Sequence, residues 1–303
     1  MVNALPEKLA SQYALPAWFR QEIPDIPKIK KMQMLLRDRR LSTVCEEARC
    51  PNMGQCWGRG VATFMILGEV CTRSCSFCNV TTGKPAIPDP SEPEHVAEMV
   101  KNLGLKYAVI TSVTRDDLED EGAEQFARTV RRIKQANPGV AVELLIPDFS
   151  GRESLIERVI AAAPEVIGHN IEMAEHLFPF IRPQADYHRS LKVLKMIKKK
   201  APGIMVKSGF MVGLGETDAD VEKMMEDIRQ AGCDILTIGQ YLSPSRGLRH
   251  VPVQRFVHPE VFDQYRQHSL RMGFSHVLSG PLVRSSYIAE SGYEACRELL
   301  ERP

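Results

Sequence analysis

The sequence lacks an excess of charge of either sign. Its 303 residues include 39 Lys and Arg against 38 Asp and Glu, a formal net charge of +1. A nucleic-acid-binding protein usually presents a basic field that neutralises phosphates, so we expect no nucleic-acid partner. No apolar run approaches the roughly 20 residues that a membrane-spanning helix needs. We therefore expect no membrane association either.

The sequence also lacks internal repeats, low-complexity tracts and a signal peptide. Pro6, Glu7 and Lys8 interrupt the N-terminal stretch that would have to be apolar in a signal peptide, so we expect a cytoplasmic protein. With 44% hydrophobic residues, the chain suffices for one large domain or two small ones.

Eight cysteines stand out against this ordinary composition. In a reducing compartment they are poor candidates for structural disulfides, which makes metal binding or redox catalysis the leading explanation. The first triad consists of Cys45, Cys50 and Cys56, and the central triad of Cys71, Cys75 and Cys78. Cys233 and Cys296 match neither triad, and for Cys233 we expect a buried free thiol.

A βα rhythm begins after the first triad. Apolar runs predict strands at 62–68, 107–112, 140–146, 165–170, 204–213 and 235–241, with helix-like segments between them. Six strands alternating with helices predict a parallel sheet, either a partial (β/α)6 TIM-type barrel or a doubly wound open sheet. Polar residues such as Thr111, Asn170 and Gln240 close several strands, at the edge where both architectures bind ligands.

The central triad lies in CTRSCSFC, directly after the first strand of this series. Such a loop can bind three irons of a cubane cluster but supplies no fourth thiolate. An iron without a protein ligand can bind substrate, as the open position does in catalytic zinc sites. The alternative is structural zinc, but zinc sites usually pair two short two-cysteine knuckles, which a lone three-cysteine loop fits poorly.

The first triad, in CEEARCPNMGQC, also has three cysteines and no obvious fourth ligand. Taken alone it suits structural zinc and an iron–sulfur cluster about equally. Near the C-terminus stands the sequence Arg284-Ser285-Ser286-Tyr287, which on its own would be an ordinary polar loop.

The central triad resembles the signature of the radical S-adenosylmethionine superfamily. The resemblance implies that the open iron chelates the amino and carboxylate groups of the methionine moiety. One electron then breaks the sulfonium C–S bond, and the resulting 5′-deoxyadenosyl radical abstracts hydrogen from unactivated carbon.

The two triads and RSSY together resemble the lipoyl synthase family over roughly residues 40–290. The matching segments are PNMGQCW, ATFMILG, CTRSCSFCNV, TSVTRDDLEDEGA, VKSGFMVGLGET and LTIGQYLSPS. The resemblance implies an α/β fold, a partial (β/α)6 TIM-type barrel, with three regions. These are an N-terminal extension with the auxiliary-cluster cysteines (1–60), the barrel (61–272) and a C-terminal segment with RSSY that closes the barrel mouth (273–303).

The resemblance also implies two [4Fe–4S] clusters with separate roles. The cluster of the first triad is auxiliary and is consumed as the sulfur donor, with a serine of RSSY as its fourth ligand. We assign Ser285, with Ser286 as the second choice, and place Arg284 beside the cluster. Two sulfurs enter an octanoyl chain carried on a lysine of a lipoyl carrier domain or protein, two S-adenosylmethionine molecules are used, and a low-potential donor of the ferredoxin or flavodoxin type supplies electrons.

We expect S-adenosylmethionine to lie at the carboxyl edge of the strands. Glu172 suits the ribose and Lys207 the carboxylate, although these two side chains could instead form a structural ion pair. Gly213, Gly215 and Glu216 follow the fifth strand, where backbone could approach the adenosine. The expected contacts are Phe77, Thr111, Ser112, Asn170, Glu172, Lys207 and Gln240.

Several positions depart from the family pattern. Gln55 and Val61 stand where we expect Glu and Thr, Glu121 where Gly is usual, and Ile288 where His usually follows RSSY. These departures leave open a paralogue with a changed substrate or partner. A biotin synthase-like enzyme with another substrate, and a zinc-stabilised α/β binding protein, are the other readings; the first triad and RSSY argue against the former.

Overall fold

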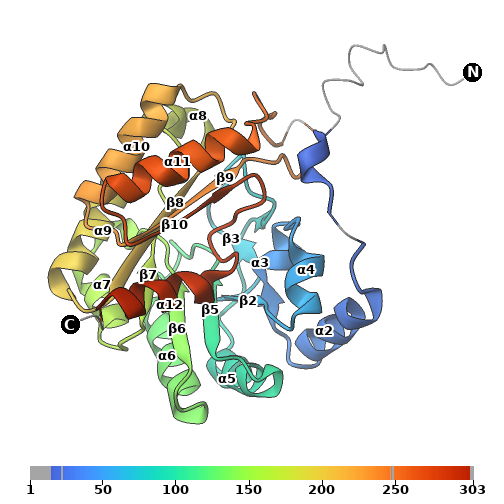
Figure 1. Ribbon diagram of the computed structural model, residues 1–303. Coiled ribbons are helices and arrows are strands. Elements are labelled where there is room, and N and C mark those ends of the chain that lie inside the picture. The colour runs from blue at the N-terminus through green and yellow to red at the C-terminus, as the bar shows by residue number, and fades with distance from the viewer. Residues whose placement is uncertain (1–14, 22, 246, 248, 301–303) are drawn as a thin grey trace, which may run out of the picture.

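The computed structural model describes residues 15–21, 23–245, 247 and 249–300 (Figure 1). Pro6, Glu7 and Lys8, on which the signal-peptide argument rested, lie outside the described residues. In the described part of the chain, no helix is both long and apolar enough to cross a lipid bilayer.

An eight-stranded sheet forms the centre of the molecule, in the order β1-β2-β5-β6-β7-β8-β9-β10. All six predicted strands are confirmed as β2 (Thr63–Ile66), β5 (Tyr107–Ser112), β6 (Ala141–Leu145), β7 (Val166–Gly168), β8 (Met205–Val212) and β9 (Ile235–Gln240). Two strands are added at the edges. They are β1 (Ser42–Thr43), antiparallel to β2, and β10 (His276–Gly280), parallel to β9.

Parallel pairing brings the carboxyl ends of neighbouring strands to one edge. Thr111 of β5 lies opposite Met65 of β2 and Leu145 of β6, and Leu145 lies opposite Gly168 of β7. The strands are almost continuously buried, as expected for a parallel sheet covered by crossover helices. The partial-barrel prediction is therefore confirmed over these strands.

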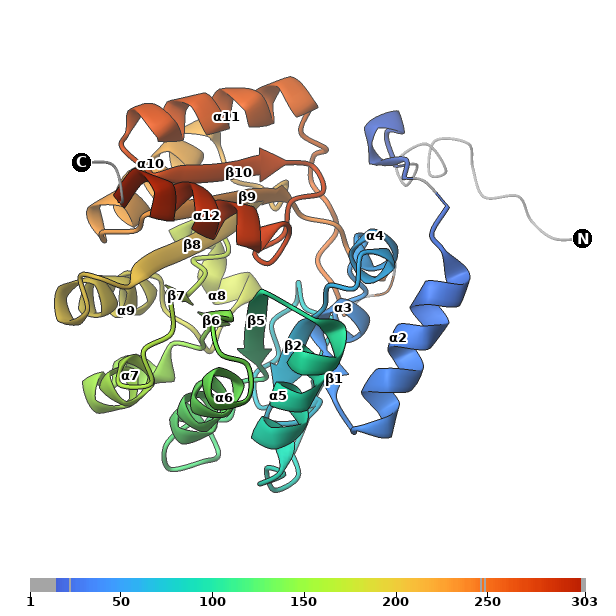
Figure 2. The same cartoon turned by 60° about the horizontal axis from the view of Figure 1, so that its bottom comes forward.

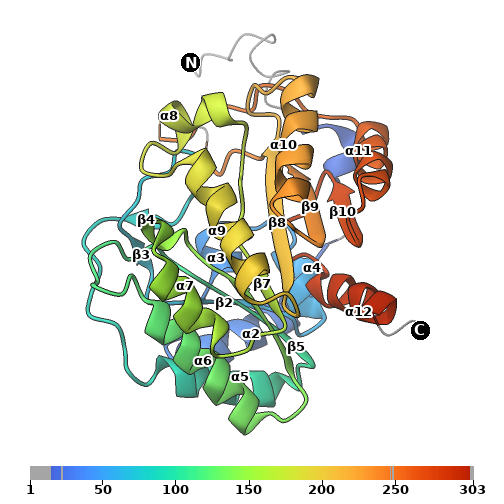
Figure 3. The ribbon, with the colours of Figure 1, turned by 90° about the vertical axis from the view of Figure 1, so that its left-hand side faces the viewer.

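Six helices cover the outside of the arc of strands (Figures 2 and 3). They are α5 (Glu92–Leu103), α6 (Ala123–Ala136), α7 (Glu153–Ile160), α9 (Tyr187–Lys200), α10 (Asp218–Gln230) and α11 (Pro259–Arg271). In α10 a capping box starts the helix, because Thr217 and Asp220 exchange side-chain and backbone hydrogen bonds. The helix ends before Gly232, whose φ of 90° is the left-handed conformation that glycine favours.

The N-terminal region packs beside β2. Helix α2 (Ile26–Asp38) turns Met32 and Leu36 into the core and exposes Lys28, Lys30 and Lys31 to solvent. The helix is therefore amphipathic, and it follows the short turn η1 (Ala17–Phe19). Two short helices, α3 (Val44–Glu47) and α4 (Met53–Gly58), carry the first cysteine triad, and α2 packs on α4.

The remaining elements surround the carboxyl edge and the concave side of the sheet. They are β3 (Val70–Cys71), β4 (Thr81–Thr82), η2 (Phe149–Gly151), η3 (Glu175–Leu177), α8 (Phe178–Ile181) and α12 (Ala289–Leu300). In Figure 1, α12 crosses in front of the strands, and Tyr293 packs on Tyr107 of β5 with ring centroids 5.4 Å apart. Tyr107 is the first residue of β5, so α12 packs against the amino ends of the strands, whereas closure of the barrel mouth by the C-terminal segment stays a prediction.

Candidate metal centres

The central triad lies on one loop between β3 and β4, at the carboxyl edge of β2. Cys71 ends β3, and its Sγ accepts hydrogen bonds from the backbone N–H groups of Arg73 (3.4 Å) and Thr114 (3.3 Å). Two backbone hydrogen bonds therefore fix the position of this sulfur.

A buried ion network fixes this loop. Arg73, between Cys71 and Cys75, donates to both carboxylate oxygens of Asp116 (2.7 and 2.9 Å) and of Asp148 (2.8 and 3.0 Å). Arg189 at the start of α9 donates to Asp148 as well, at 2.9 Å. Burial disfavours the charged form of Asp148, but its bonds to Arg73 outweigh burial and hold the pKa well below its usual range.

Burial governs the other thiols of both triads. It raises the pKa of Cys45 to about 11 and of Cys78 to about 12, and it also raises the pKa values of Cys50, Cys56 and Cys75. Neighbouring cysteines of the same triad add to the shift for Cys45 and Cys78. A bound metal deprotonates its thiol ligands, so these cysteines would bind it as thiolates despite the effect of burial.

The first triad meets the C-terminal segment around a narrow pocket. Asn52 Nδ2 donates to the Leu282 carbonyl at 2.6 Å, and the Tyr287 hydroxyl donates to Gln55 Oε1 at 3.2 Å. The pocket is lined by Cys45, Cys50, Asn52, Met53, Cys56, Val61, Ala62, Thr63, Arg284, Ser286 and Tyr287. The predicted meeting of the first triad with RSSY is therefore present.

The two serines of RSSY occupy different surroundings. Ser286 lines the pocket that the three thiols share. The Ser285 hydroxyl accepts a hydrogen bond from Asn170 Nδ2 at 2.5 Å, on the side of the central site. This geometry gives Ser286, the second choice from sequence, a direct route to the thiols, while Ser285 as cluster ligand stays a prediction.

Arg284 is buried beside Cys50. Burial lowers the pKa of its guanidinium, and the negative charge of a Cys50 thiolate opposes that shift. Its Nη1 donates to the Val283 carbonyl at 2.6 Å. The predicted position of Arg284 next to the first triad matches this arrangement.

The two cysteine sites are neighbours. Asn79, directly after Cys78, donates from Nδ2 to the Glu47 carbonyl of α3 at 2.7 Å. On the other side, Asn170 donates both to Ser285 and to Glu172, the latter at 3.1 Å. A polar bridge therefore joins the C-terminal segment to the central site.

Of the expected S-adenosylmethionine contacts, four lie together at the carboxyl edge of β5 and β7. Asn170 and Glu172 are hydrogen-bonded to each other, and burial raises the pKa of Glu172 against the opposing charge of Arg182. Ser112 Oγ is buried without a hydrogen-bond partner, whereas Thr111 Oγ1 donates to the Leu145 carbonyl at 3.0 Å. A buried hydroxyl without a partner at the end of β5 and an Asn–Glu pair after β7 lie at the same edge of the sheet, which suits a polar ligand. Phe77, in the central loop, packs partly buried against the core.

Two expected contacts serve the scaffold instead. Lys207 Nζ pairs with Glu143 Oε1 at 2.7 Å, and Tyr107 donates to the other Glu143 oxygen at 2.6 Å, all three side chains being buried. Gln240 is fully buried; its Nε2 contacts the carbonyls of Val212, Tyr241 and Arg255, and its Oε1 accepts from the Val257 N–H. The structure does not bring either side chain to the group around Asn170.

The side chain of Glu216 caps the backbone of the glycine turn that follows β8. Glu216 accepts hydrogen bonds from the N–H groups of Gly213 (2.7 Å) and Leu214 (2.9 Å), and Gly213 has a φ of 97°. Gly213 also faces Gln240, where a Cβ would collide with the side-chain amide. The turn has the close packing expected from its glycines, with Glu216 committed to the backbone.

Arg182 is a site residue that the sequence pattern did not reveal. It follows α8, and its positive charge together with a side-chain hydrogen bond opposes the rise in the pKa of Cys75. Arg182 Nη1 also donates to the Asn170 carbonyl at 3.5 Å. In the sequence, Arg182 is distinguished only by following the Phe-rich turn α8. No motif predicts that this turn folds over the central loop.

The donor set fits iron–sulfur clusters better than single zinc ions. Among the residues that the structure describes, no three His, Cys, Asp or Glu side chains come close enough to hold one metal ion. A cluster spreads its thiolate ligands over several irons, so wider triads suit it. His169, directly after β7, is buried, its Nδ1 contacts the Ile146 carbonyl at 2.9 Å, and burial lowers its pKa to about 4.

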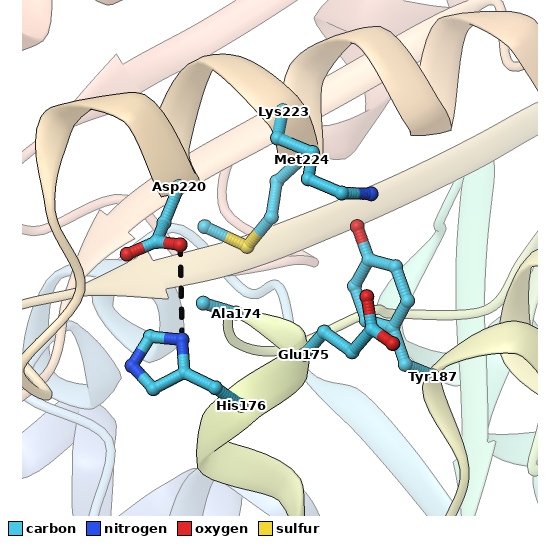
Figure 4. A pocket seen from close by; sticks show the side chains of 7 residues that line it. All are labelled: Ala174, Glu175, His176, Tyr187, Asp220, Lys223 and Met224. Carbon is cyan, nitrogen blue, oxygen red and sulfur yellow. Dashed lines mark ion pairs between the residues drawn. The ribbon is translucent and has the colours of Figure 1, made fainter.

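A second cavity, of about 290 Å³, lies on the outer surface between η3 and α10 (Figure 4). His176 and Asp220 face each other across it at 3.7 Å, and Lys223 lies over the ring of Tyr187. Lys223 pairs with Asp227 and Glu175 with His188, both outside the lining, and none of the lining residues belongs to either triad. It is therefore separate from the cysteine sites.

Comparisons with known proteins agree with this geometry. Residues 65–228 match the radical SAM superfamily, and residues 3–50 match the N-terminal domain of lipoyl synthase of the radical SAM family. A lipoyl synthase of Caldicellulosiruptor saccharolyticus is 52% identical over 91% of this chain and 96% of its own length. One of Nitratidesulfovibrio vulgaris is 47% identical over 98% and 99% of the two chains.

Distant solved structures share the fold. Streptococcus suis SuiB bound to S-adenosylmethionine has a TM-score of 0.54 at 9% identity, covering 75% of this chain and 53% of its own. HydG, a maturase of the [FeFe]-hydrogenase, has a TM-score of 0.54 at 13% identity, with the same coverage of the two chains. At such low identity these likenesses support the radical SAM architecture alone.

Proposed function

This chain belongs to the lipoyl synthase family of the radical SAM superfamily, and from that premise we propose how its two cysteine sites divide the reaction. Family membership makes it a radical SAM sulfurtransferase of lipoyl cofactor synthesis that depends on [4Fe–4S] clusters and S-adenosylmethionine. It acts on an octanoylated substrate and needs a reductant. The observation that carries the proposal is that the first triad and RSSY line one pocket. The hydrogen bond between Asn170 and Ser285 links RSSY to the side of the central triad.

Cys71, Cys75 and Cys78 are the proposed ligands of the radical-generating cluster. With S-adenosylmethionine bound, that cluster supplies a radical able to abstract hydrogen from an unactivated carbon. The chain's part is positional: Arg73 holds the loop, and Arg182 places a positive charge beside Cys75. Asn170, Glu172 and Ser112 are the proposed polar contacts of S-adenosylmethionine, because they line the same edge and include a free buried hydroxyl.

Cys45, Cys50 and Cys56 are the proposed ligands of the second cluster, which serves as the sulfur substrate. A serine completes the set; a hard hydroxyl oxygen beside three soft thiolates is a weaker iron ligand, which suits a cluster that must be dismantled. Ser285 and Ser286 are the candidates, and the pocket lining supports Ser286. Arg284 contributes a fixed positive charge next to Cys50.

Membership of the lipoyl synthase family supports a proposal for the partners. The proposed acyl substrate is an octanoyl chain on a lysine of a lipoyl carrier domain or protein, and the chain must reach the pocket at the first triad. The proposed reductant is a low-potential protein of the ferredoxin or flavodoxin type. The proposed location is the cytoplasm.

Single alanine replacements of the two serines test the proposal. In anaerobic assays with S-adenosylmethionine, dithionite and an octanoylated carrier domain, 5′-deoxyadenosine and lipoyl product are measured separately. The variant that loses the cluster ligand should keep forming 5′-deoxyadenosine, while its lipoyl product falls by at least about a hundredfold. Residues that only support a metal ligand already cost about 10–100-fold when replaced, so the ligand itself should cost no less. Ser291→Ala is the matched control, since Ser291 donates only to the Ile288 carbonyl.

Three outcomes discriminate. Loss in Ser286→Ala alone assigns the ligand to Ser286, and loss in Ser285→Ala alone assigns it to Ser285. If both variants make lipoyl product at the unmodified rate, no RSSY serine is the ligand and the proposed division of the reaction is wrong.

A further inference from the structure

The indole of Trp57 carries a buried N–H group without an acceptor of its own. Trp57 lies on α4, directly after Cys56, and only 1% of the residue is exposed. Among the residues that the structure describes, no acceptor meets its Nε1 with full hydrogen-bond geometry. A buried donor normally has a partner, because an unmet one keeps the cost of leaving water. The indole N–H of Trp57 therefore needs an explanation from the site beside it.

The sulfur of Cys45 is the polar atom on which this indole acts. Burial raises the pKa of Cys45 most strongly, and the Thr63 N–H and the Trp57 side chain oppose that rise as hydrogen-bond donors. Cys45 is itself 6% exposed and lines the pocket that the three thiols share. A neutral thiol is a weak acceptor, which agrees with an indole that approaches the sulfur without completing a hydrogen bond.

Metal binding changes the acceptor strength of Cys45. The form of cysteine that binds a metal is the thiolate. Hydrogen bonds to a charged acceptor are shorter and roughly twice as strong as those between neutral groups. Because Trp57 is closed off from solvent, water does not compete for its N–H. A thiolate at Cys45 is thus the acceptor that suits this buried donor.

The donor at Cys45 differs in kind from those at Cys50. Backbone N–H groups of Asn52 and Met53 act on the Cys50 sulfur. Backbone donors persist when a side chain is replaced, whereas the indole N–H belongs to tryptophan alone among the side chains. The contact between Trp57 and Cys45 can therefore be removed by one substitution that leaves every cysteine in place.

We propose that Trp57 is a positioning residue for the cluster of the first triad, whose indole N–H donates to the Cys45 thiolate, fixes that sulfur and makes the cluster easier to reduce. The inference rests on the proposed function, since it needs the first triad to hold a cluster. Hydrogen bonds to the sulfurs help to set the reduction potential of an iron–sulfur cluster. A donor stabilises the state with more negative charge, which is the reduced state, so it raises the potential.

Trp57→Phe tests the inference, because it removes the N–H and keeps an aromatic ring. The variant is studied in the holoenzyme and in the full chain with Cys71, Cys75 and Cys78 replaced by Ala, so that the first triad alone holds a cluster. Redox titration followed by electron paramagnetic resonance measures the potential. The ratio of reduced to oxidised cluster at a fixed potential should fall about tenfold, a downward shift of about 59 mV for one electron. An unchanged midpoint potential would overturn the inference.

Two controls separate the N–H from packing. The chain has two tryptophans, and the second, Trp18, is 36% exposed and packs on Phe19 and His258. Trp18→Phe is the matched variant and should leave the potential unchanged. In that variant, tryptophan is then replaced during expression by benzothienylalanine, which keeps the bicyclic shape of Trp57 and has sulfur in place of the N–H. It should lower the potential as Trp57→Phe does. If only the Phe variant shifts, the effect is packing and the inference is wrong.

Failure of the proposed function would look different. If the first triad takes up no four-iron cluster from iron and sulfide, the proposed function and the role of Trp57 fall together. If the loaded holoenzyme cleaves S-adenosylmethionine but forms no lipoyl product on any octanoylated carrier, only the proposed function is wrong. A loaded cluster whose potential does not depend on the indole N–H rejects the role of Trp57 and leaves the proposed function standing.

Discussion

Single residues outside the cysteine loop determine how the loop is held. Asp148 is fully buried and accepts hydrogen bonds from both Arg73 and Arg189. Removing one member of such a buried ion network leaves the others without a counter-charge. Asp148 therefore matters to the central site although it touches no cysteine.

Asp148→Asn should lower the free energy of unfolding by about 3–5 kcal/mol, because Arg73 then keeps only Asp116 and Arg189 loses its carboxylate partner. Urea denaturation at pH 7 measures the change. Asp116→Asn should cost less, since the Asp116 side chain is 34% exposed and water can replace part of its role. Equal costs would contradict the view that burial makes Asp148 the centre of the network.

The same residue predicts a pH dependence. The folded-state pKa of Asp148 is depressed, so between that value and the unfolded pKa of about 3.9 the unfolded chain binds more protons. Its contribution to stability is complete above the unfolded pKa and is lost as pH falls through the folded pKa. Unfolding titrations of the apoprotein from pH 6 downward should show a shallower acid loss for Asp148→Asn than for the unmodified chain. Parallel curves would contradict this assignment.

Variants of Lys207 show whether this side chain contacts S-adenosylmethionine or only stabilises the fold through Glu143. Lys207→Met alone should lower the free energy of unfolding by about 3–5 kcal/mol, because Glu143 is left buried without its cation. Adding Glu143→Gln should recover most of that loss. Affinity for S-adenosylmethionine, measured by equilibrium dialysis, should stay unchanged in the double variant. A fall of tenfold or more would restore Lys207 as a contact of the ligand.

At the scale of elements, the C-terminal segment joins the two sites because β9 lets it approach. A Cβ at Gly239 would collide with the carbonyl of Val283, directly before RSSY. Strand β9 thus needs glycine at this position, where another backbone comes close. Asn52 and Gln55 then fix the segment from the side of the first triad.

Gly239→Ala should displace RSSY without altering any cysteine. We expect lipoyl product to fall at least about tenfold while 5′-deoxyadenosine formation persists, since a shift of about 1 Å at a reacting site can cost two orders of magnitude. Gly203→Ala is the control, because a Cβ there meets no atom within 4 Å. Equal product from both variants would show that the close approach of Val283 is not needed.

Sequence predicted these elements unevenly, for physical reasons. The six buried strands were predictable because a parallel sheet covered on both sides requires continuous apolar runs. β1 has only two residues, so it carries no such signal. For Gln240 and Lys207, position near a strand end predicts contact with the ligand. That position does not show whether a side chain faces the ligand or bonds other parts of the protein, as Gln240 and Lys207 do. Arg182 was missed because its contact with Cys75 depends on how a turn folds over a distant loop.

At the scale of the whole molecule, the fold places the two cysteine triads, the proposed metal sites, side by side at one edge of a partial barrel. The central loop follows β2 and the first triad precedes it, so both flank the same strand, and the C-terminal segment closes the group. Radical formation and sulfur supply can therefore be separated by mutation while the scaffold stays the same.

Iron content tests the two-site architecture. Reconstituted protein should contain about eight irons per chain if each triad holds one four-iron cluster. Replacing Cys71, Cys75 and Cys78 together by Ala should remove about half of the iron. Cys233→Ala, at a buried thiol outside both triads, should retain it all. Full iron retention in the triple variant would refute the central assignment.

The most direct test of the account removes the first triad and follows both products. In the Cys45→Ala, Cys50→Ala, Cys56→Ala variant, reconstituted with iron and sulfide and supplied with S-adenosylmethionine, dithionite and an octanoylated carrier domain, 5′-deoxyadenosine and lipoyl product are quantified together by mass spectrometry. The account predicts continued formation of 5′-deoxyadenosine and no lipoyl product, because the radical arises at the central triad and the sulfur at the first. Lipoyl product at the unmodified rate would contradict it.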